Sequence, residues 1–488
     1  METEKFDLIV IGGGPAGEKG AAQAAYFGKR VALVESASEP GGACTNTGTL
    51  PSKTLRETAV HLSGLSMRGL LNVNYDLNAT VSASHLKTRK DMVVEAERRR
   101  IHNNISRHHI AYIQGFGRFA DAHTLEVLDA KGSPARRLEA PFILIATGST
   151  PHRPAEIPFD DVCVWDSDTV LNLKKVPASL TVIGAGVIGS EYASIFAALG
   201  CKVELVDGRD TLLPFLDKEI ADVLTRELEK LGVRFHFKAT VKSYTRRGDS
   251  VLAVLDGGET LETEALLFAA GRNGNTKGLG LDKIGVVPDK RGQIKVNEHY
   301  QTDAPHVYAA GDVIGFPALA STSMDQGRLA MCHAFQLTYL QRLAEHLPMG
   351  IYTIPEVSSV GETEESARKK GLDIEVGRAR FSENARAQIM GDTGGVLKLV
   401  FDSQNLRVLG VHIVCERASD IITPGLFALR LETGIDFFID TVFNFPTLCE
   451  AYKYAAYDGL GRLGARGRDT GKTLREKGGK PTAPAKPG

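Results

Sequence analysis

One strand–turn–helix–strand pattern occurs twice in the sequence, and this repeat restricts the possible folds more than any other feature does. In the first copy, an apolar run at residues 6–11 leads into a glycine-rich turn at 12–17, and an alanine-rich helical stretch follows. The second copy has its glycine-rich turn at residues 184–189. Each copy continues into a second apolar strand, which ends at an acidic residue equally far from the last glycine: Glu35 in the first copy and Asp207 in the second. The sequence therefore predicts two βαβ units of the same design.

Both turns read G-x-G-x-x-G, which is the order of glycines that a dinucleotide-binding βαβ unit needs. The first glycine permits the tight turn, the second lets the backbone approach a pyrophosphate, and the third lets the helix pack against the strand. The helix N-terminus attracts the phosphates, and the acidic residue accepts hydrogen bonds from a ribose diol. A glycine-rich turn in an ordinary βαβ unit is the alternative, and it is less favoured because the pattern occurs twice. The predicted cofactor-binding glycines are Gly12, Gly14 and Gly17 in the first unit and Gly184, Gly186 and Gly189 in the second.

The composition excludes several classes of protein. A chain of 488 residues is too long for one compact core, so several domains are expected. The net charge of −1 gives no electrostatic reason to bind nucleic acid or an anionic membrane. No apolar run approaches the length of a spanning helix, and the N-terminus does not resemble a signal peptide. The cysteines are scattered without a C-x-x-C pair, which argues against a zinc site and a secreted disulfide framework. We therefore expect a cytoplasmic protein with no nucleic-acid or membrane partner.

The adjacent histidines His108 and His109 could suggest a metal site. Neighbouring residues on a helix point about a third of a turn apart, so they are poor co-ligands. A solvated helical face is the better interpretation, and we expect no bound metal.

Further motifs, in order along the chain, resemble those of the FAD-dependent pyridine nucleotide-disulfide oxidoreductases. Residues 142–149 contain an A-T-G turn similar to the one that leaves the flavin domain, and residues 302–312 closely resemble the second FAD fingerprint. The pair ending at Arg272 resembles the family's returning G-R motif, and residues 446–450 resemble its C-terminal H-P-T-x-x-E segment. The resemblance implies an α/β fold with two Rossmann-like dinucleotide-binding domains, for FAD and NAD(P), plus a C-terminal α+β dimerisation domain. It also implies a homodimer or a higher homo-oligomer.

The same resemblance implies the domain organisation. After residue 463 the composition changes to Gly, Lys, Arg, Pro and Thr, which cannot bury enough apolar surface to offset the entropy of ordering. The expected segments are a first FAD-binding part at 1–150, an NAD(P)-binding domain at 151–274, a second FAD-binding and central part at 275–348, a dimerisation domain at 349–463, and a disordered basic tail at 464–488.

Two positions depart from the disulfide reductases of this family. Those enzymes have two redox cysteines at C-x4-C, whereas here Cys44 is followed by Thr49. Phe445 replaces the histidine that exchanges protons with dithiol substrates, and phenylalanine cannot titrate. Both losses concern the same half-reaction. These features, with short runs at 192–196 and 350–356, resemble the soluble, Si-specific pyridine nucleotide transhydrogenases. That branch implies an oxidoreductase with bound, non-covalent FAD that passes hydride reversibly between NADPH and NAD+. The two coenzymes would occupy one site in turn.

The resemblance also assigns roles to individual residues. Lys53 resembles the family lysine beside flavin N5, and Glu191 resembles its ion-pair partner, so these two are the predicted catalytic residues. Asp312 would bind the ribityl chain of the flavin. Cys44 is expected to pack beside the flavin rather than act as a nucleophile, because no resolving cysteine lies near it in the sequence. The remaining predicted cofactor contacts are Glu35, Gly41, Gly42, Gly148 and Arg272.

Asp207 and Arg209 are the predicted determinants of coenzyme choice. Asp207 suits the free ribose of NAD and would repel the 2′-phosphate of NADP. Arg209 could attract that phosphate through charge-assisted hydrogen bonds. The alternative is that Arg209 is a loop charge that faces water. Having both residues suits an enzyme that accepts both coenzymes.

Two other functions stay open for the sequence alone. One is an NAD(P)H:quinone or dye reductase on the same scaffold, with Phe445 helping to line an acceptor pocket. The other is a non-catalytic, redox-sensing flavoprotein that uses Cys44 and the basic tail.

Overall fold

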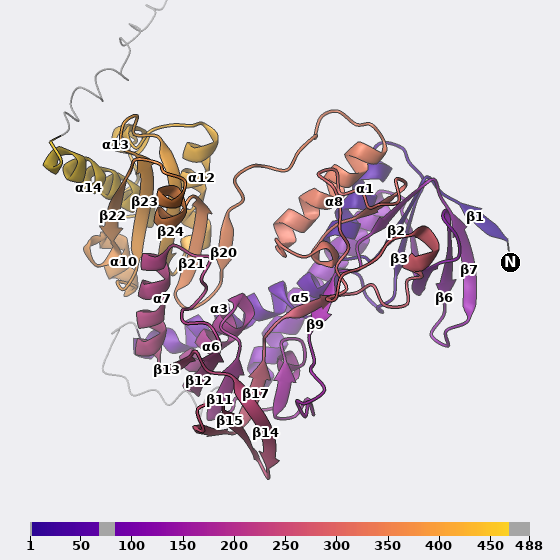
Figure 1. Ribbon diagram of the computed structural model, residues 1–488, viewed down its shortest axis with the longest axis horizontal. Coiled ribbons are helices and arrows are strands. Elements are labelled where there is room, and N and C mark those ends of the chain that lie inside the picture. Colours follow the sequence, from indigo (N-terminus) through magenta and orange to yellow (C-terminus); the bar gives the residue numbers. More distant parts are fainter. Residues whose placement is uncertain (1, 68–82, 468–488) are drawn as a thin grey trace, which may run out of the picture.

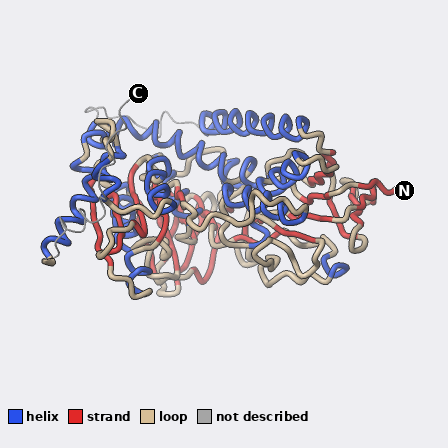
Figure 2. Tube along the Cα trace, turned by 90° about the horizontal axis from the view of Figure 1, so that it is seen from above, coloured by secondary structure: helices blue, strands red, loops and turns tan. Residues whose placement is uncertain are grey.

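In the computed structural model, which describes residues 2–67 and 83–467, the described chain forms three lobes, each built on a five-stranded sheet (Figure 1). In the view of Figure 2, long helices run along one side of the molecule with strands beneath them. No helix in the described ranges is both long and apolar enough to cross a membrane.

The first lobe contains a parallel sheet built from distant parts of the chain. Its last strand, from residues 307–309, pairs with the strand at 142–145, so the chain returns to this lobe after forming the second one. The strand order is β19 (Val307–Ala309), β8 (Phe142–Ile145), β2 (Leu8–Ile11), β3 (Val31–Glu35) and β4 (Ala111–Gln114), and the helices are α1 (Pro15–Tyr26), α2 (Gly42–Asn46), α3 (Thr49–Met67), α5 (Ala83–Arg107) and α8 (Ala320–Ala334).

Helices α1 and α8 pack backbone to backbone. A Cβ atom built on Gly327 of α8 would lie 2.1 Å from the Ala16 carbonyl oxygen, so only glycine permits this approach. The contact fixes the returning segment against the glycine-rich turn that opens α1.

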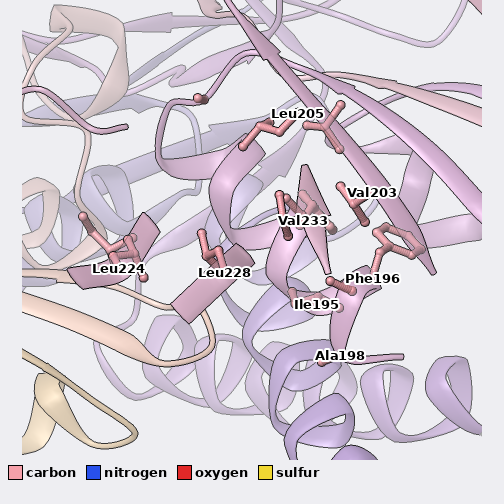
Figure 3. Packing of buried hydrophobic residues seen from close by; sticks show 14 of the residues in the cluster. Ile195, Phe196, Ala198, Val203, Leu205, Leu224, Leu228 and Val233 are labelled. Carbon is pink, nitrogen blue, oxygen red and sulfur yellow. The ribbon is translucent and has the colours of Figure 1, made fainter. Parts of the chain in front are cut away.

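The second lobe repeats the parallel design. Its sheet has the order β10 (Val164–Asp166), β17 (Ala265–Phe268), β11 (Ser179–Ile183), β12 (Lys202–Asp207) and β13 (Val233–Phe237), flanked by α6 (Val187–Ala198) and α7 (Lys218–Leu231). Figure 3 shows Phe196 of α6 and Leu228 of α7 among the buried side chains that fill the space beside Val203 of β12. Asp217 caps α7, since its carboxylate accepts a hydrogen bond from the Glu219 N–H. The central strands are apolar on both faces: one face packs against α6 and α7, and the other packs residues such as Ile183 and Leu266 against the strand at residues 250–255.

The third lobe is an antiparallel sheet with helices packed on it. A Cβ atom on Gly377 would lie 2.0 Å from the Ala455 carbonyl oxygen, so the C-terminal helix lies directly on the sheet. The strand order is β20 (Met349–Ile351), β21 (Glu356–Gly361), β24 (Val408–Cys415), β23 (Val396–Asp402) and β22 (Ile374–Arg380). The helices are α9 (Glu364–Lys369), α10 (Ala385–Met390), α11 (Ala418–Ile421), α12 (Thr423–Arg430), α13 (Asp436–Asp440) and α14 (Ala451–Ala465).

Smaller sheets complete the first two lobes. The two-stranded sheet of β9 (Ser149–Pro151) and β18 (Arg272–Gly274) joins the two segments by which the chain leaves the first lobe and returns to it. The other small sheet of the first lobe consists of β1 (Thr3–Lys5), β5 (Phe116–Phe119), β6 (Thr124–Leu128) and β7 (Pro134–Glu139). That of the second lobe consists of β14 (Val241–Arg247), β15 (Ser250–Leu255) and β16 (Thr260–Thr263). Single 3-10 turns are η1 (Thr169–Asn172), η2 (Leu281–Ile284), η3 (Asp312–Ile314), η4 (Phe381–Glu383) and η5 (Leu448–Glu450).

Two parallel sheets of Rossmann type and a C-terminal α+β lobe confirm the predicted fold class. The expected tail at 464–488 falls largely outside the described residues. Helix α14 runs to Ala465, so the first residues of that segment belong to a helix.

Candidate functional site

The two glycine-rich turns have the same geometry. Gly12 and Gly184 adopt φ angles of 104° and 102°, which favour glycine. A Cβ atom on Gly17 would lie 1.8 Å from the Gly12 carbonyl oxygen, and the same distance separates a Cβ on Gly189 from the Gly184 oxygen. The first and third glycines are therefore required by the turn and by the close approach of helix to strand, as the sequence pattern predicts.

The second glycine of each turn faces open space. A Cβ on Gly186 would meet no atom within 4 Å, and one on Gly14 would meet only the Gly42 Cα at 3.6 Å. Both glycines are the N-caps of their helices, and no side chain caps either helix. The backbone N–H groups in the first turn of each helix, except at Pro15, therefore remain available. Each turn thus leaves room for a phosphate at a helix N-terminus.

Each of the two acidic residues accepts a hydrogen bond from the backbone of its own glycine turn. Glu35 Oε2 accepts a hydrogen bond from the Gly13 N–H at 2.7 Å, and Asp207 Oδ2 accepts one from the Ala185 N–H at 2.6 Å. Gly13 and Ala185 occupy the same position in their turns. Each carboxylate therefore lies at the end of its strand and beside its turn, where a nucleotide ribose would reach it.

Arg209 does not point away from the protein into water but folds back onto Asp207. Its Nε donates to Asp207 Oδ1 at 2.8 Å and its Nη2 to Asp207 Oδ2 at 2.6 Å. Burial alone would raise the pKa of Asp207, yet the hydrogen bonds from Arg209 and from backbone N–H groups hold it below its ordinary value. The Arg209 side chain is still 45% exposed. The two predicted determinants of coenzyme choice therefore form one ion pair.

The segment around Cys44 lies against the first glycine turn. Gly41 and Gly42 have φ angles of 105° and 55°, and a Cβ on Gly42 would lie 2.9 Å from the Gly14 Cα. Burial raises the pKa of the Cys44 thiol, while a hydrogen bond with Thr49 acts in the opposite direction. Cys44 forms no disulfide. The sulfur is thus predominantly a thiol at neutral pH.

Lys53 and Glu191 form the ion pair that the sequence predicts. Lys53 Nζ on α3 lies 2.6 Å from Glu191 Oε2 on α6, and the carboxylate is only 5% exposed. The pair joins the first lobe to the second. A third residue completes it, because the Tyr352 N–H donates to Glu191 Oε1 at 2.9 Å. Sequence reasoning missed Tyr352: the run at 350–356 supported the family resemblance, but no spacing in it indicates a contact with Glu191.

Asp312 lies at the start of η3, at the end of the returning strand. Its Oδ2 accepts a hydrogen bond from the Ser149 Oγ at 3.0 Å. Arg272 binds the same serine, with Nε donating to Ser149 Oγ at 2.8 Å and Nη2 to the Ser149 carbonyl at 2.7 Å. Arg272 therefore reaches Asp312 through Ser149, a residue that the sequence analysis did not single out. Gly148, which precedes it, has a φ of 68°.

Phe445 takes no part in the site contacts described above. It lies in the third lobe and is 71% exposed. Other large apolar side chains of that lobe are exposed as well: Phe427, Leu431, Phe437, Val442, Tyr454 and Tyr457. Among the residues that the structure describes, no group of three or more His, Cys, Asp or Glu side chains is arranged to hold a metal ion.

Two family models match this chain. The model for pyridine nucleotide-disulphide oxidoreductases covers residues 6–327, and the model for the dimerisation domain of these enzymes covers residues 347–456. The chain belongs to the pyridine nucleotide-disulphide oxidoreductase family. The family predicted from the sequence motifs is thus confirmed.

Comparison with individual proteins shows which members of the family this chain resembles. A soluble pyridine nucleotide transhydrogenase of Mycobacterium tuberculosis is 42% identical over 461 residues, which are 94% of this chain and 98% of the relative. One of Chromohalobacter salexigens is 43% identical over 469 residues, 95% of this chain and 100% of the relative. Among solved structures, the HOCl-induced flavoprotein disulfide reductase RclA from Escherichia coli matches with a TM-score of 0.82 and 29% identity, over 93% of this chain and 99% of that one. The resemblance to the transhydrogenase branch is confirmed.

The residues present fit the FAD that this family of oxidoreductases implies. The first glycine turn leaves room for a pyrophosphate, and the Glu35 carboxylate lies beside that turn. Thr147 of the A-T-G turn lies beside Gly12, and its Oγ1 is a buried atom for which the described chain supplies no hydrogen-bond partner. A bound dinucleotide at this turn is the natural partner for that hydroxyl.

Proposed function

We propose that this protein transfers hydride between NADPH and NAD+, in either direction, with non-covalently bound FAD as the relay. The observation that carries the proposal is Thr49, which stands where the disulfide reductases have their second redox cysteine and leaves Cys44 as the one sulfur of that segment. One sulfur cannot cycle between dithiol and disulfide within its own segment. A second nicotinamide coenzyme can then take the electrons from the reduced flavin. The transhydrogenase names of the relatives support the same function.

When bound, FAD supplies a centre that accepts hydride from one nicotinamide and returns it to another. We propose that this chain holds the FAD through the first glycine turn, with Gly12, Gly14, Gly17, Glu35, Gly41, Gly42, Gly148 and Asp312, and that Ser149 and Arg272 hold the Asp312 carboxylate in place. Cys44 packs against this site as a thiol. Lys53 places a positive charge at the flavin, and Glu191 fixes the position of that charge.

The second glycine turn, with Gly184, Gly186 and Gly189, is the proposed site for both nicotinamide coenzymes in turn. The Asp207–Arg209 pair can adapt to either one. For NAD, the ribose diol competes with Arg209 for the Asp207 oxygens. For NADP, the guanidinium turns from Asp207 to the 2′-phosphate. Arg209 is 45% exposed and can turn away, whereas Asp207 is only 8% exposed and keeps the backbone N–H groups of Ala185 and Arg209 as hydrogen-bond donors.

We propose the domain boundaries at 1–150, 151–274, 275–348 and 349–463, with a disordered basic tail from 464 and a cytoplasmic location. The exposed apolar side chains of the third lobe, together with the match to a dimerisation domain, support a homodimer formed through that lobe. Light scattering on the purified protein tests the dimer, and a monomer at micromolar concentration would contradict it.

Steady-state kinetics with NADPH and thio-NAD+ test the function. Because the two coenzymes share one site, double-reciprocal plots should give parallel lines. Intersecting lines would require a second nucleotide site and contradict the proposal. Turnover with a quinone far above that with thio-NAD+ would instead favour the quinone reductase. Negligible turnover with every acceptor, together with a specific protein partner, would favour the redox sensor.

A further inference from the structure

Tyr352 contacts both members of the Lys53–Glu191 pair. Its N–H donates to Glu191 Oε1 at 2.9 Å, and its ring lies under the Lys53 ammonium, with Nζ 4.9 Å from the ring centroid. Lys53 lies on α3 of the first lobe and Glu191 on α6 of the second, whereas Tyr352 follows β20 of the third. All three lobes of the chain therefore meet at one ammonium group.

The segment that carries Tyr352 is anchored independently of Lys53. Arg56, one turn further along α3, is 4% exposed; its Nε donates to the Thr353 carbonyl at 3.2 Å, and its Nη1 lies 2.9 Å from Glu356 Oε1. Residues three apart on a helix share a face, so Lys53 and Arg56 both point at the same segment. The backbone that follows Tyr352 is thus anchored by contacts that do not involve Lys53.

A ring in this position restricts a side chain that would otherwise be mobile. A lysine ammonium sits on a flexible four-carbon stem and can pivot about a single carboxylate. The negative face of an aromatic ring attracts it from a second direction, and the attraction is stronger where water is excluded. The Lys53 side chain is 24% exposed, so its ammonium is partly shielded from water. The carboxylate of Glu191 and the ring of Tyr352 together define the position of Nζ.

We propose that Tyr352 is a positioning residue that holds the Lys53 ammonium at the flavin, and that it acts on the cofactor through that charge. This inference rests on the proposed function in one respect, the placement of Lys53 at the FAD. A fixed positive charge stabilises the cofactor when it holds additional electrons, so it raises the midpoint potential. An ammonium that is free to move away has a smaller effect. The aromatic ring of Tyr352, rather than its hydroxyl, is the part that matters.

The test is the two-electron midpoint potential of FAD in the full-length holoenzyme, measured by spectroscopic titration against a reference dye. Tyr352→Leu should lower the potential by about 15–30 mV, which is a three- to tenfold change in the equilibrium constant at about 30 mV per tenfold for two electrons. Tyr352→Phe keeps the ring and should keep the wild-type potential. Lys53→Met should lower the potential further than Tyr352→Leu does. In the Lys53→Met background, Tyr352→Leu should cause no additional change.

Two further variants serve as controls. Tyr244→Leu makes the same truncation at a half-buried tyrosine on β14, in the small sheet of the second lobe, and should leave both potential and turnover unchanged. If Tyr352→Leu does not retain FAD, Tyr352→Met replaces it, since methionine is also apolar and lacks the aromatic face.

Each other result overturns the inference in a recognisable way. If Lys53→Met lowers the potential and Tyr352→Leu does not, Tyr352 does not position the charge. If Tyr352→Leu lowers the midpoint potential equally in the wild-type and Lys53→Met proteins, its effect does not depend on Lys53. If Lys53→Met itself leaves the midpoint potential unchanged, Lys53 does not lie at the flavin. Tyr352 then cannot act on FAD through Lys53, and the proposal is refuted. Turnover of NADPH with thio-NAD+ on the same samples distinguishes these outcomes from a failure of the proposed transhydrogenase function.

Discussion

Replacing Arg209 with alanine should change the binding of the two coenzymes in opposite directions. In the free enzyme, Arg209 donates to both carboxylate oxygens of Asp207, so the variant loses a phosphate ligand and also frees a ribose ligand. NADPH should bind more weakly and NADH somewhat more tightly. A loop charge without a role would affect neither coenzyme.

The magnitudes follow from the exposure of the pair. A hydrogen bond to a charged group contributes about 1.5–3 kcal/mol. When the guanidinium turns to the phosphate, its contact with Asp207 is lost. Arg209 is 45% exposed, and the buried Asp207 carboxylate keeps its backbone N–H donors, so this loss is about 0.2–1 kcal/mol. The net loss for NADPH is then about 0.5–2.8 kcal/mol, or roughly 2- to 100-fold in Kd. For NADH the gain is at most about 1 kcal/mol, or roughly fivefold.

Calorimetric titration of the oxidised holoenzyme with NADP+ and NAD+, and stopped-flow reduction by NADPH and NADH, measure both effects. Arg246→Ala is a matched control, because Arg246 is similarly exposed and pairs with Asp160, away from the glycine turn. A loss of equal size for both coenzymes would refute the reasoning, since it would show a general disturbance of the site. An unchanged affinity for NADPH would remove Arg209 from phosphate recognition.

Three further outcomes are expected. Cys44→Ser should keep FAD and most transhydrogenase turnover, because burial keeps the sulfur a thiol; a loss above about a hundredfold, roughly 2.7 kcal/mol of barrier, would show that the thiol takes part. Removing residues 468–488 should leave the melting temperature and turnover as they are, and an unstable truncated enzyme would contradict the expectation of a disordered tail. Lys398→Met should destabilise the protein by about 3–5 kcal/mol, because it leaves the fully buried Asp217 carboxylate without its cation; thermal unfolding measures this, and an unchanged melting temperature would count against it.

Much of the fold could be predicted from local pattern. The two glycine turns require close contacts that only glycine permits, and those contacts lie within one βαβ unit, so spacing along the chain was enough to find them. Spacing also predicted Glu35 and Asp207, because each carboxylate accepts a hydrogen bond from the glycine turn of its own unit. The Lys53–Glu191 pair joins two lobes and was predicted through the family resemblance, because no local period connects those positions.

The remaining site residues depend on contacts that no spacing encodes. Ser149 lies between Arg272 and Asp312 because three separate segments converge there, and serine carries no motif of its own. Arg209 looked in the sequence like a free loop charge or a phosphate ligand, yet in the fold its nearest partner is Asp207.

The sequence by itself determined the fold class, the two nucleotide units, the loss of the second redox cysteine at Thr49 and the family, since each is written in residue identity and short-range order. Only the tertiary structure decided that Tyr352 meets Lys53 and Glu191, and that Arg56 anchors its segment. The physical reason is that these contacts join residues from three lobes. Their geometry is set by how whole sheets and helices pack, and that packing sums many weak apolar contacts spread along the entire chain.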